Sequence, residues 1–151
     1  MHIGLEEYRA IKRISKRDAD YDTFRREALV LKELRHPGIP MIYDLEEDSE
    51  FFYLIEEYLE GYSLYALIAN QGPIQEAEAV RYGMQVCGLV AYMHSACELP
   101  ILHLDLQPNN LIICNGTVKL IDFDHAAGCR WANIAPKRFG TVGCAAPEQY
   151  A

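Results

Sequence analysis

The amino-acid sequence predicts an α+β fold built from short strands, helices and one β-hairpin. Short extended segments near the N-terminus indicate strands, and two later segments with apolar residues three and four positions apart indicate helices. An Asn115-Gly116 pair lies between two apolar runs, which is the strongest short sequence pattern for a hairpin turn. No internal repeat or Ser/Gly-rich linker divides the chain, so one unit is expected.

Composition narrows the classes of function. The 151 residues are 50% hydrophobic, which is enough apolar material for a core. The formal net charge of -8 argues against a protein that binds nucleic acid or a membrane surface, because either partner requires a basic face. No apolar run approaches the ~18 residues that span a bilayer, and no signal-peptide pattern begins the chain. We therefore expect a cytoplasmic protein with no membrane segment in this piece.

The cysteines are widely spaced and include no Cys-x-x-Cys pair. A zinc site or a disulfide framework is therefore not expected. The prediction is that all five are buried free thiols in a reducing cytoplasm. They are Cys87, Cys97, Cys114, Cys129 and Cys144.

The first part of the chain predicts a strand, a helix and two more strands. Residues 8–14 are extended in character, and residues 21–35 have a helical pattern with Asp22 or Thr23 as caps. A His-Pro-Gly sequence ends that helix. The two further strands are expected over residues 40–45 and 51–57.

The middle of the chain predicts two helices and a polar loop. A short helix over residues 63–70 ends at a Gly-Pro pair, and a long helix covers residues 75–94. The loop at residues 99–110 that follows is rich in the residue types that chemistry uses. The apolar stripe of the long helix runs through Val80, Met84, Cys87 and Ala91.

The hairpin brings two oxygen-bearing side chains together. Its strands are expected over residues 111–114 and 117–121. Pairing across the turn joins the outer ends of the strands, so Asn110 should lie beside Asp122. These two residues are candidate ligands of a metal ion.

One carboxylate of the first helix lies within an apolar face. Phe24, Glu27, Leu31 and Leu34 follow one another at spacings of three, four and three. A buried carboxylate without a partner is costly, so Glu27 requires a cation. The alternative is an ordinary exposed glutamate.

Several motifs occur in one order along the chain. They are HLDLQPNN at residues 103–110, IDFD at residues 121–124, GT at residues 140–141 and APE at residues 146–148. This order resembles the signature set of the eukaryotic-type Ser/Thr protein kinase domain. Upstream, Ala-Ile-Lys at residues 10–12 resembles the third-strand motif of the same family.

The resemblance implies a protein-kinase-like two-lobe fold that is incomplete here. A remnant of the β-rich N-lobe would occupy residues 1–57, a hinge residues 58–61, and the first part of the helical C-lobe residues 62–151. The glycine-rich loop of the family should precede Lys12 by two strands, yet the chain begins eleven residues before that lysine. The later C-lobe helices would follow the APE motif.

The resemblance also implies transfer of the γ-phosphoryl group of ATP to a Ser or Thr hydroxyl of a protein substrate. Asp105 would accept the proton of that hydroxyl, and Asn110 with Asp122 would hold Mg²⁺. Lys12 would position the α- and β-phosphates and would itself be held by Glu27.

Further positions follow from the same resemblance. The carbonyl of Glu57 and the backbone of Leu59 would bind the adenine edge, and Ala10 belongs to the implied nucleotide site. Thr141 would contact Asp105, as in the Ser/Thr branch of the family.

Two departures from the family pattern concern regulation. Leu104 stands where most of these kinases have an arginine that pairs with a phosphorylated activation loop. Between Asp122 and Gly140 there is no Ser, Thr or Tyr that could carry a phosphate. The sequence therefore predicts a kinase of the type without this arginine, whose activation loop is not phosphorylated.

Three more departures concern the chemistry. Gln107 replaces a lysine that steadies the γ-phosphate, which should slow transfer. Asp124 replaces a glycine and either adds a metal oxygen or hampers ligand placement. Glu56 replaces an apolar residue behind the adenine and must find a partner or shift its pKa upward. The alternative function is a pseudokinase or signalling scaffold, whereas the APE motif disfavours a small-molecule kinase.

Overall fold

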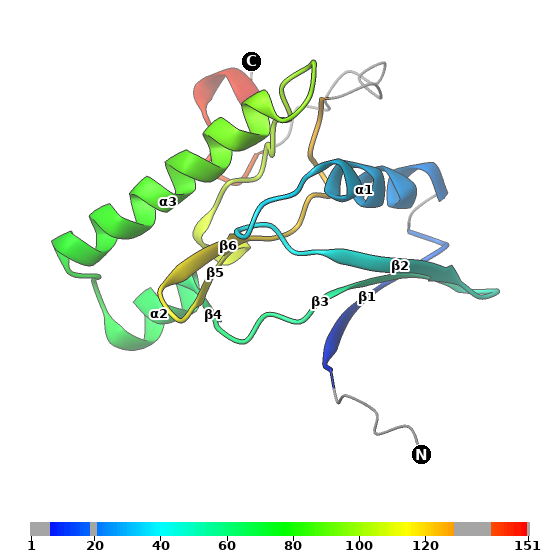
Figure 1. The fold of residues 1–151 in the computed structure, drawn as a ribbon, viewed down its shortest axis with the longest axis horizontal. Coiled ribbons are helices and arrows are strands. Elements are labelled where there is room, and N and C mark those ends of the chain that lie inside the picture. The colour runs from blue at the N-terminus through cyan, green and yellow to red at the C-terminus, as the bar shows by residue number, and fades with distance from the viewer. Residues whose placement is uncertain (1–6, 19–20, 129–139, 151) are drawn as a thin grey trace.

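The computed structural model describes residues 7–18, 21–128 and 140–150 (Figure 1). The described residues form three α-helices and two three-stranded antiparallel sheets, which confirms the α+β class. In chain order the elements are β1 (Arg9–Ser15), α1 (Tyr21–Glu33), β2 (Ile42–Glu47), β3 (Phe51–Glu57), β4 (Tyr62–Ser63), α2 (Leu64–Gln71), α3 (Glu76–Ser95), β5 (Leu111–Cys114) and β6 (Thr117–Leu120).

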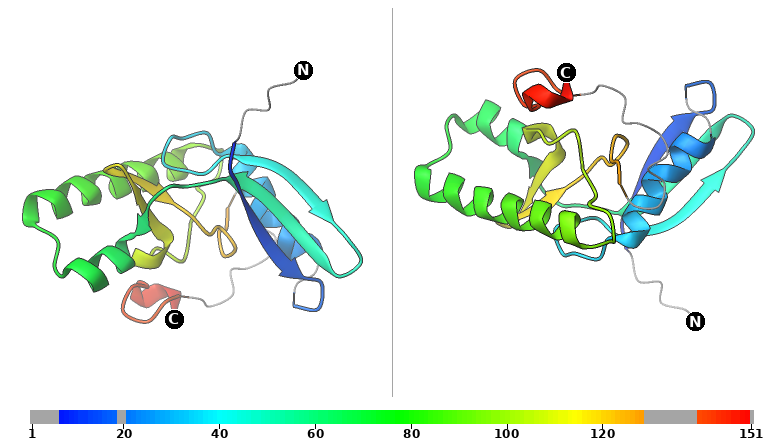
Figure 2. Two further views of the ribbon diagram at one scale, coloured as in Figure 1. Left: turned by 90° about the horizontal axis from the view of Figure 1, so that it is seen from below. Right: turned by 90° about the horizontal axis from the view of Figure 1, so that it is seen from above.

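The first sheet has the strand order β1-β3-β2 and is covered on one face by α1 (Figure 2). Phe24 of α1 stacks on Phe52 of β3 with ring centroids 4.9 Å apart, and Leu54 beside it is fully buried. Lys12 of β1 pairs with Leu54, and Ala10 pairs with Glu56. Because paired residues share a face of the sheet, Lys12 points to the same side as the core under α1.

The second sheet has the strand order β4-β5-β6. Asn115 and Gly116 both have positive φ, at 48° and 80°, as a type I′ hairpin turn requires. Gln85 of α3 fixes this hairpin, because its amide donates to the Gly116 carbonyl at 3.0 Å and accepts from the Val118 N–H at 2.9 Å. The predicted hairpin is confirmed.

The connection between α1 and β2 joins the two sheets. The Arg35 N–H donates to the Tyr92 hydroxyl of α3 at 2.6 Å, and the Leu120 N–H of β6 donates to the Gly38 carbonyl at 2.8 Å. A β-carbon at Gly38 would lie 2.6 Å from the side chain of Leu89 and 3.0 Å from the Val118 carbonyl oxygen, so glycine permits this close approach without a shift of its neighbours. The end of α1 is thereby fixed to α3 and β6.

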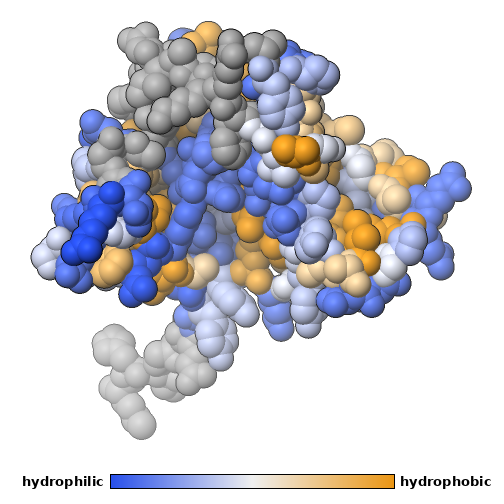
Figure 3. Space-filling view, turned by 180° about the vertical axis from the view of Figure 1, so that it is seen from behind, coloured by the Kyte–Doolittle hydropathy of each residue, from blue (hydrophilic) through white to orange (hydrophobic). Residues whose placement is uncertain are grey.

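The predicted buried stripe of α3 is wrong. Val80 and Met84 are 55% and 71% exposed, and Cys87 and Ala91 are exposed as well. The face that packs on the core carries Tyr82, Leu89 and Met93. The sequence offers two apolar faces on this helix, and the contact with β6 through Gln85 decides which is buried. Figure 3 shows hydrophobic residues at the surface over the end of the molecule that holds α2 and α3.

Two smaller expectations are also corrected. Asp22 and Thr23 lie inside the first turn of α1, which begins at Tyr21, so neither precedes the helix as a cap. Cys87, Cys114 and Cys144 are free thiols as predicted, but none of the four described cysteines is buried. They lie on the outer side of α3, in the loop after it, at the turn end of β5 and near the C-terminus; Cys129 lies outside the described residues.

No helix in the described ranges has the length and apolar character needed to cross a bilayer.

Candidate active site

Lys12 and Glu27 form an ion pair between the first sheet and α1. Lys12 Nζ lies 3.1 Å from Glu27 Oε1 and 3.0 Å from Oε2, and Glu27 is only 3% exposed. Phe24, Leu31 and Leu34 are buried on the same face of α1. The cation that the burial of Glu27 required is therefore present, and the exposed-glutamate alternative is excluded.

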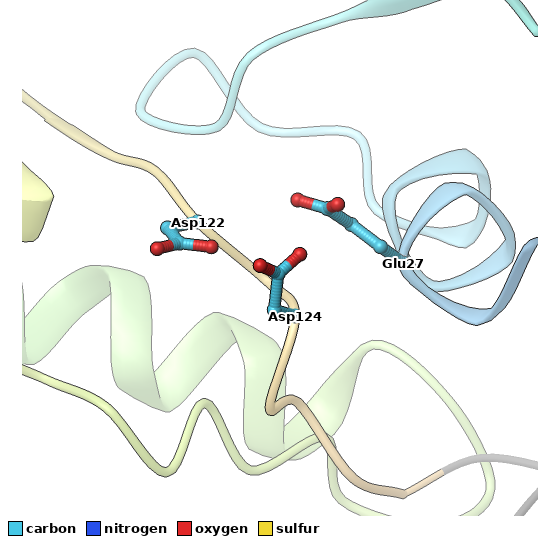
Figure 4. Close-up of side chains that lie close together, drawn as sticks. All are labelled: Glu27, Asp122 and Asp124. Atoms are coloured by element: carbon cyan, nitrogen blue, oxygen red, sulfur yellow. The ribbon is translucent and has the colours of Figure 1, made fainter. Parts of the chain in front are cut away.

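Lys12 also contacts two aspartates that follow β6. Its Nζ lies 3.2 Å from Asp122 Oδ1 and 2.6 Å from Asp124 Oδ1. Figure 4 shows the carboxylates of Glu27, Asp122 and Asp124 turned toward one another, with one oxygen of each within 4.8 Å of the others. Three carboxylates from two distant segments thus converge on one ammonium group.

The charges of this cluster shift one another's pKa. Burial disfavours the charged form of Lys12, yet the carboxylates of Glu27, Asp124 and Asp122 outweigh it and raise the pKa of this lysine. Burial raises the pKa of Glu27, and the hydrogen bond to Asp124 adds to the rise. Burial also acts to raise the pKa of Asp124, but hydrogen bonds with Glu27 and Lys12 prevail and lower it. Lys12 and Asp124 are therefore charged at neutral pH.

Asp105 is a buried carboxylate held by three side chains. Thr141 Oγ1 donates to Oδ1 at 2.6 Å, while Gln107 Nε2 and Asn110 Nδ2 donate to Oδ2 at 2.8 and 3.0 Å. Burial would raise the pKa of Asp105, but these three hydrogen bonds outweigh it and lower the pKa. Asp105 stays ionised and able to accept a proton. The predicted contact with Thr141 is confirmed.

His103 fixes the start of the same loop. Its Nε2 lies 3.1 Å from the Ile121 carbonyl and its Nδ1 accepts from the Asp105 N–H at 3.3 Å, which places the proton on Nε2. Its ring meets Phe123 edge-on at 4.9 Å. This neutral tautomer ties the backbone of Asp105 to the end of β6.

We expect His103 to make the protein less stable in acid. Burial lowers the pKa of His103 below its ordinary value of 6.5, so the neutral form is favoured in the folded state. The stability it contributes is complete above pH 6.5 and is lost as the pH falls through the lowered folded pKa. Urea unfolding from pH 7 downward should show a steeper loss for the wild type than for His103→Gln. Parallel curves for the two proteins would contradict this assignment.

The predicted metal ligands Asn110 and Asp122 lie at the same end of the hairpin. The Ile121 N–H donates to the Asn110 carbonyl at 2.9 Å, so Asn110 lies across the hairpin from the neighbour of Asp122. Asn110 Nδ2 donates to both the carbonyl and the carboxylate of Asp105, which leaves Oδ1 as its ligand atom. Asp122 adopts a positive φ of 63°, a conformation that is rare outside glycine. Hard oxygen donors of this kind fit Mg²⁺.

The predicted adenine-binding segment lies between the two sheets. Glu57 ends β3, and its side chain forms an ion pair with Lys119 of β6 at 2.6 Å. Its N–H and its Oε2 both bond the backbone of Met41. Leu59 follows, half-buried, before β4 begins. The ion pair was not predicted, although a lysine within the apolar run of residues 111–121 is an available signal.

Glu56 points to the same side of the first sheet as Ala10 and Lys12. It is half-buried, and burial raises its pKa, with Asp122 and Asp124 adding to the rise and Lys12 opposing it. The upward shift expected for a carboxylate at this position is confirmed.

The remaining motif residues surround the loop at residues 99–110. Leu104 has a φ of 64°, and its carbonyl accepts from Gln149 Nε2 at 2.8 Å, which connects the APE segment to this loop. Asp124 is not among the described residues with positive φ, so its backbone does not require a glycine. Residues 129–139 of the predicted activation loop lie outside the described residues.

The chain is similar in sequence to known protein kinases. Residues 1–150 match the family described as protein kinase domain. The chain is 35% identical to the serine/threonine-protein kinase PrkC of Bacillus subtilis over 129 residues, which cover 83% of this chain and 19% of PrkC. It is 38% identical to a probable serine/threonine-protein kinase, the KIN1 homolog of Enterocytozoon bieneusi, over 145 residues that cover 94% of this chain and 24% of that protein.

A solved structure agrees with these relatives. The crystal structure of Rad53 in complex with AMP-PNP is similar with a TM-score of 0.71 and 32% sequence identity, over 85% of this chain and 34% of that one. The chain thus spans about a quarter or less of the two relatives. The described elements form part of the two-lobe kinase fold, while the lobe boundaries at residues 57 and 61 stay a prediction. The chain belongs to the protein kinase domain family.

Proposed function

We propose that this chain is part of a Ser/Thr protein kinase that transfers the γ-phosphoryl group of ATP to protein hydroxyls with the help of Mg²⁺. The observation that carries the proposal is the Asp105 carboxylate. It is buried, ionised and bonded to Asn110, whose free oxygen lies at the same end of the hairpin as Asp122. A proton acceptor and two oxygen ligands for a metal therefore belong to one connected unit.

In the proposed reaction the substrate hydroxyl attacks the γ-phosphorus, and the bond to the oxygen that bridges the β- and γ-phosphates breaks. Asp105 orients the hydroxyl and accepts its proton, and ADP leaves. Asn110 and Asp122 would hold Mg²⁺, which would supply positive charge to the phosphate oxygens. Lys12, held by Glu27, positions the α- and β-phosphates, and the backbones of Glu57 and Leu59 bind the adenine edge beside Ala10.

The test is phosphotransfer from ATP to Ser/Thr-containing proteins by the whole natural protein that contains this chain. Transfer should require Mg²⁺, and Lys12→Ala should abolish it because the phosphates lose their cation. The matched control is Lys16→Ala, since Lys16 follows β1 and pairs with Glu47 instead of the carboxylate cluster. Equal activity in the wild type and the Lys12 variant would reject the assignment.

We also propose that phosphorylation of the activation loop does not regulate this protein. Leu104 carries no charge that could pair with a phosphate, and the span from Asp122 to Gly140 offers no hydroxyl acceptor. A stoichiometric phosphate found in that span by mass spectrometry would refute the proposal.

The second candidate function is a pseudokinase or signalling scaffold, which the neutral side chain of Gln107 favours. Its amide keeps the hydrogen bond to Asp105 but brings no positive charge to the γ-phosphate. In an active kinase we expect Gln107→Lys to raise the transfer rate by about tenfold or more, because it adds charge where the transition state is negative. Single-turnover kinetics measure the rate, with Gln107→Met as the uncharged control. A scaffold would show no transfer before or after the change.

A further inference from the structure

The Lys12 ammonium has no donor left for a ligand. A lysine carries three N–H donors. In this structure they face both oxygens of Glu27, one of Asp122 and one of Asp124, at 3.1, 3.0, 3.2 and 2.6 Å. An anion that binds Lys12 must therefore displace at least one carboxylate.

The three carboxylates differ in how firmly they are held. Glu27 is buried and accepts a second hydrogen bond from the Phe123 N–H at 3.3 Å, so it stays in place. Asp122 belongs to the proposed metal site. The side chains of Asp122 and Asp124 are 39% and 40% exposed, against 3% for Glu27, so either aspartate can turn into solvent without leaving a buried charge. Asp124 also makes the shortest contact with Lys12, although the family pattern has a glycine with no side chain at this position.

We propose that Asp124 competes with the nucleotide for Lys12. Its carboxylate takes the place on the ammonium group that phosphate oxygens would occupy, and nucleotide binds only when Asp124 is displaced. The inference rests on the proposed function, since it concerns the same lysine and the same ligand. Asp124, which stands where the family has a glycine, would thus directly lower the affinity for nucleotide.

Electrostatics add to the direct contact. Glu56 of β3 lies on the same side of the first sheet as Lys12. Burial raises its pKa, the charge of Lys12 lowers it, and the charges of Asp122 and Asp124 raise it. Four carboxylates thus surround one lysine before the polyphosphate brings further negative charge. No hydrogen bond joins Glu56 to Lys12 within the described residues, so the two effects can be separated by mutation.

The experiment measures the affinity of the whole natural protein for AMP-PNP without divalent cations, by calorimetry. Asp124→Asn keeps the size of the side chain and removes its charge, and Asp124→Gly removes the side chain. Both should bind AMP-PNP about fivefold more tightly than the wild type, which is the order of one partly exposed ion pair. Glu56→Gln is the matched control, because it removes one charge from the same space without removing a contact to Lys12. This variant measures the field effect alone, and its gain in affinity should be smaller than that of Asp124→Asn.

The same substitution made in a protein without Lys12 tests whether the effect depends on this lysine. In a Lys12→Ala protein, Asp124→Asn should no longer raise the affinity, because there is no ammonium group to release. An equal gain in that background, or a gain from Glu56→Gln as large as that from Asp124→Asn, would overturn the competition in favour of a general field effect.

The outcomes also separate this inference from the proposed function. If the wild type binds AMP-PNP and neither Asp124 variant binds more tightly, the competition is overturned and the kinase assignment stands. If no variant binds AMP-PNP either with or without Mg²⁺, both are rejected. Thermal unfolding of each variant shows whether an altered affinity reflects a folded protein.

Discussion

Replacing Asp105 by Asn is expected to lower the phosphotransfer rate of the whole protein by about 10²–10⁴ while nucleotide affinity stays nearly unchanged. The amide has the shape of the carboxylate but cannot accept a proton. The Asp105 carboxylate is bonded to Gln107, Asn110 and Thr141 and not to Lys12 within the described residues, so Lys12 keeps its geometry. Single-turnover rates at saturating ATP and calorimetric nucleotide affinities measure the two quantities separately.

The Asp105→Asn variant also rearranges the hydrogen bonds at residue 105, so a control for this structural effect is needed. Gln107 and Asn110 both donate to Oδ2, and an amide nitrogen at that position would face two donors. The variant should therefore orient its oxygen toward them and its nitrogen toward Thr141, with a loss of about 1 kcal/mol in stability. Thr141→Val removes one of these bonds and leaves the carboxylate, so it separates the two causes. A rate loss as large in Thr141→Val as in Asp105→Asn would show that loop geometry, not proton acceptance, limits the reaction.

Phe123→Ala should have the largest effect on stability, at about 3–5 kcal/mol. Phe123 is 1% exposed and lies edge-on against His103, and its N–H donates to Glu27 of α1. Its truncation leaves a cavity beside the buried His103. Urea unfolding measures the free-energy difference, and the slope shows whether the unfolding remains two-state.

Two variants calibrate this loss. Phe123→Leu fills most of the volume and should cost less than half as much. Tyr58→Ala removes a ring that is 53% exposed, so it should leave the free energy of unfolding almost unchanged. A loss in Phe123→Ala no larger than that in Tyr58→Ala would mean that the packing around Phe123 does not support the fold.

The parts of the fold predicted well from sequence depend on local chemistry. The Asn115-Gly116 turn has its own backbone preference, so it fixes the hairpin and the pairing of its ends without help from the rest of the chain. β3 covers residues 51–57 as expected, since its apolar run is bounded on both sides. The Lys12–Glu27 pair could be predicted because a carboxylate in an apolar helix face needs a cation.

The features that sequence reasoning missed depend on neighbours that are distant in the chain. The buried face of α3 is chosen by its contact with the hairpin, and a helix with two apolar faces does not show which one that will be. The Asp124 contact requires the end of β6 to meet β1, more than a hundred residues earlier. The sequence marked Asp124 as unusual but left open whether it would add a metal oxygen or hamper ligand placement.

The connection after α1 fixes the C-terminal end of this helix, so the helix can only rotate about that end. Arg35 and Gly38 tie its C-terminal side to α3 and β6, so any swing of the helix turns about that point. Glu27 lies six residues before the last residue of α1, which at 1.5 Å per residue is an arm of about 9 Å. A swing of roughly 10° would move Glu27 by about 1.5 Å, enough to break its contact with Lys12. The position of one helix therefore decides whether Glu27 contacts the lysine.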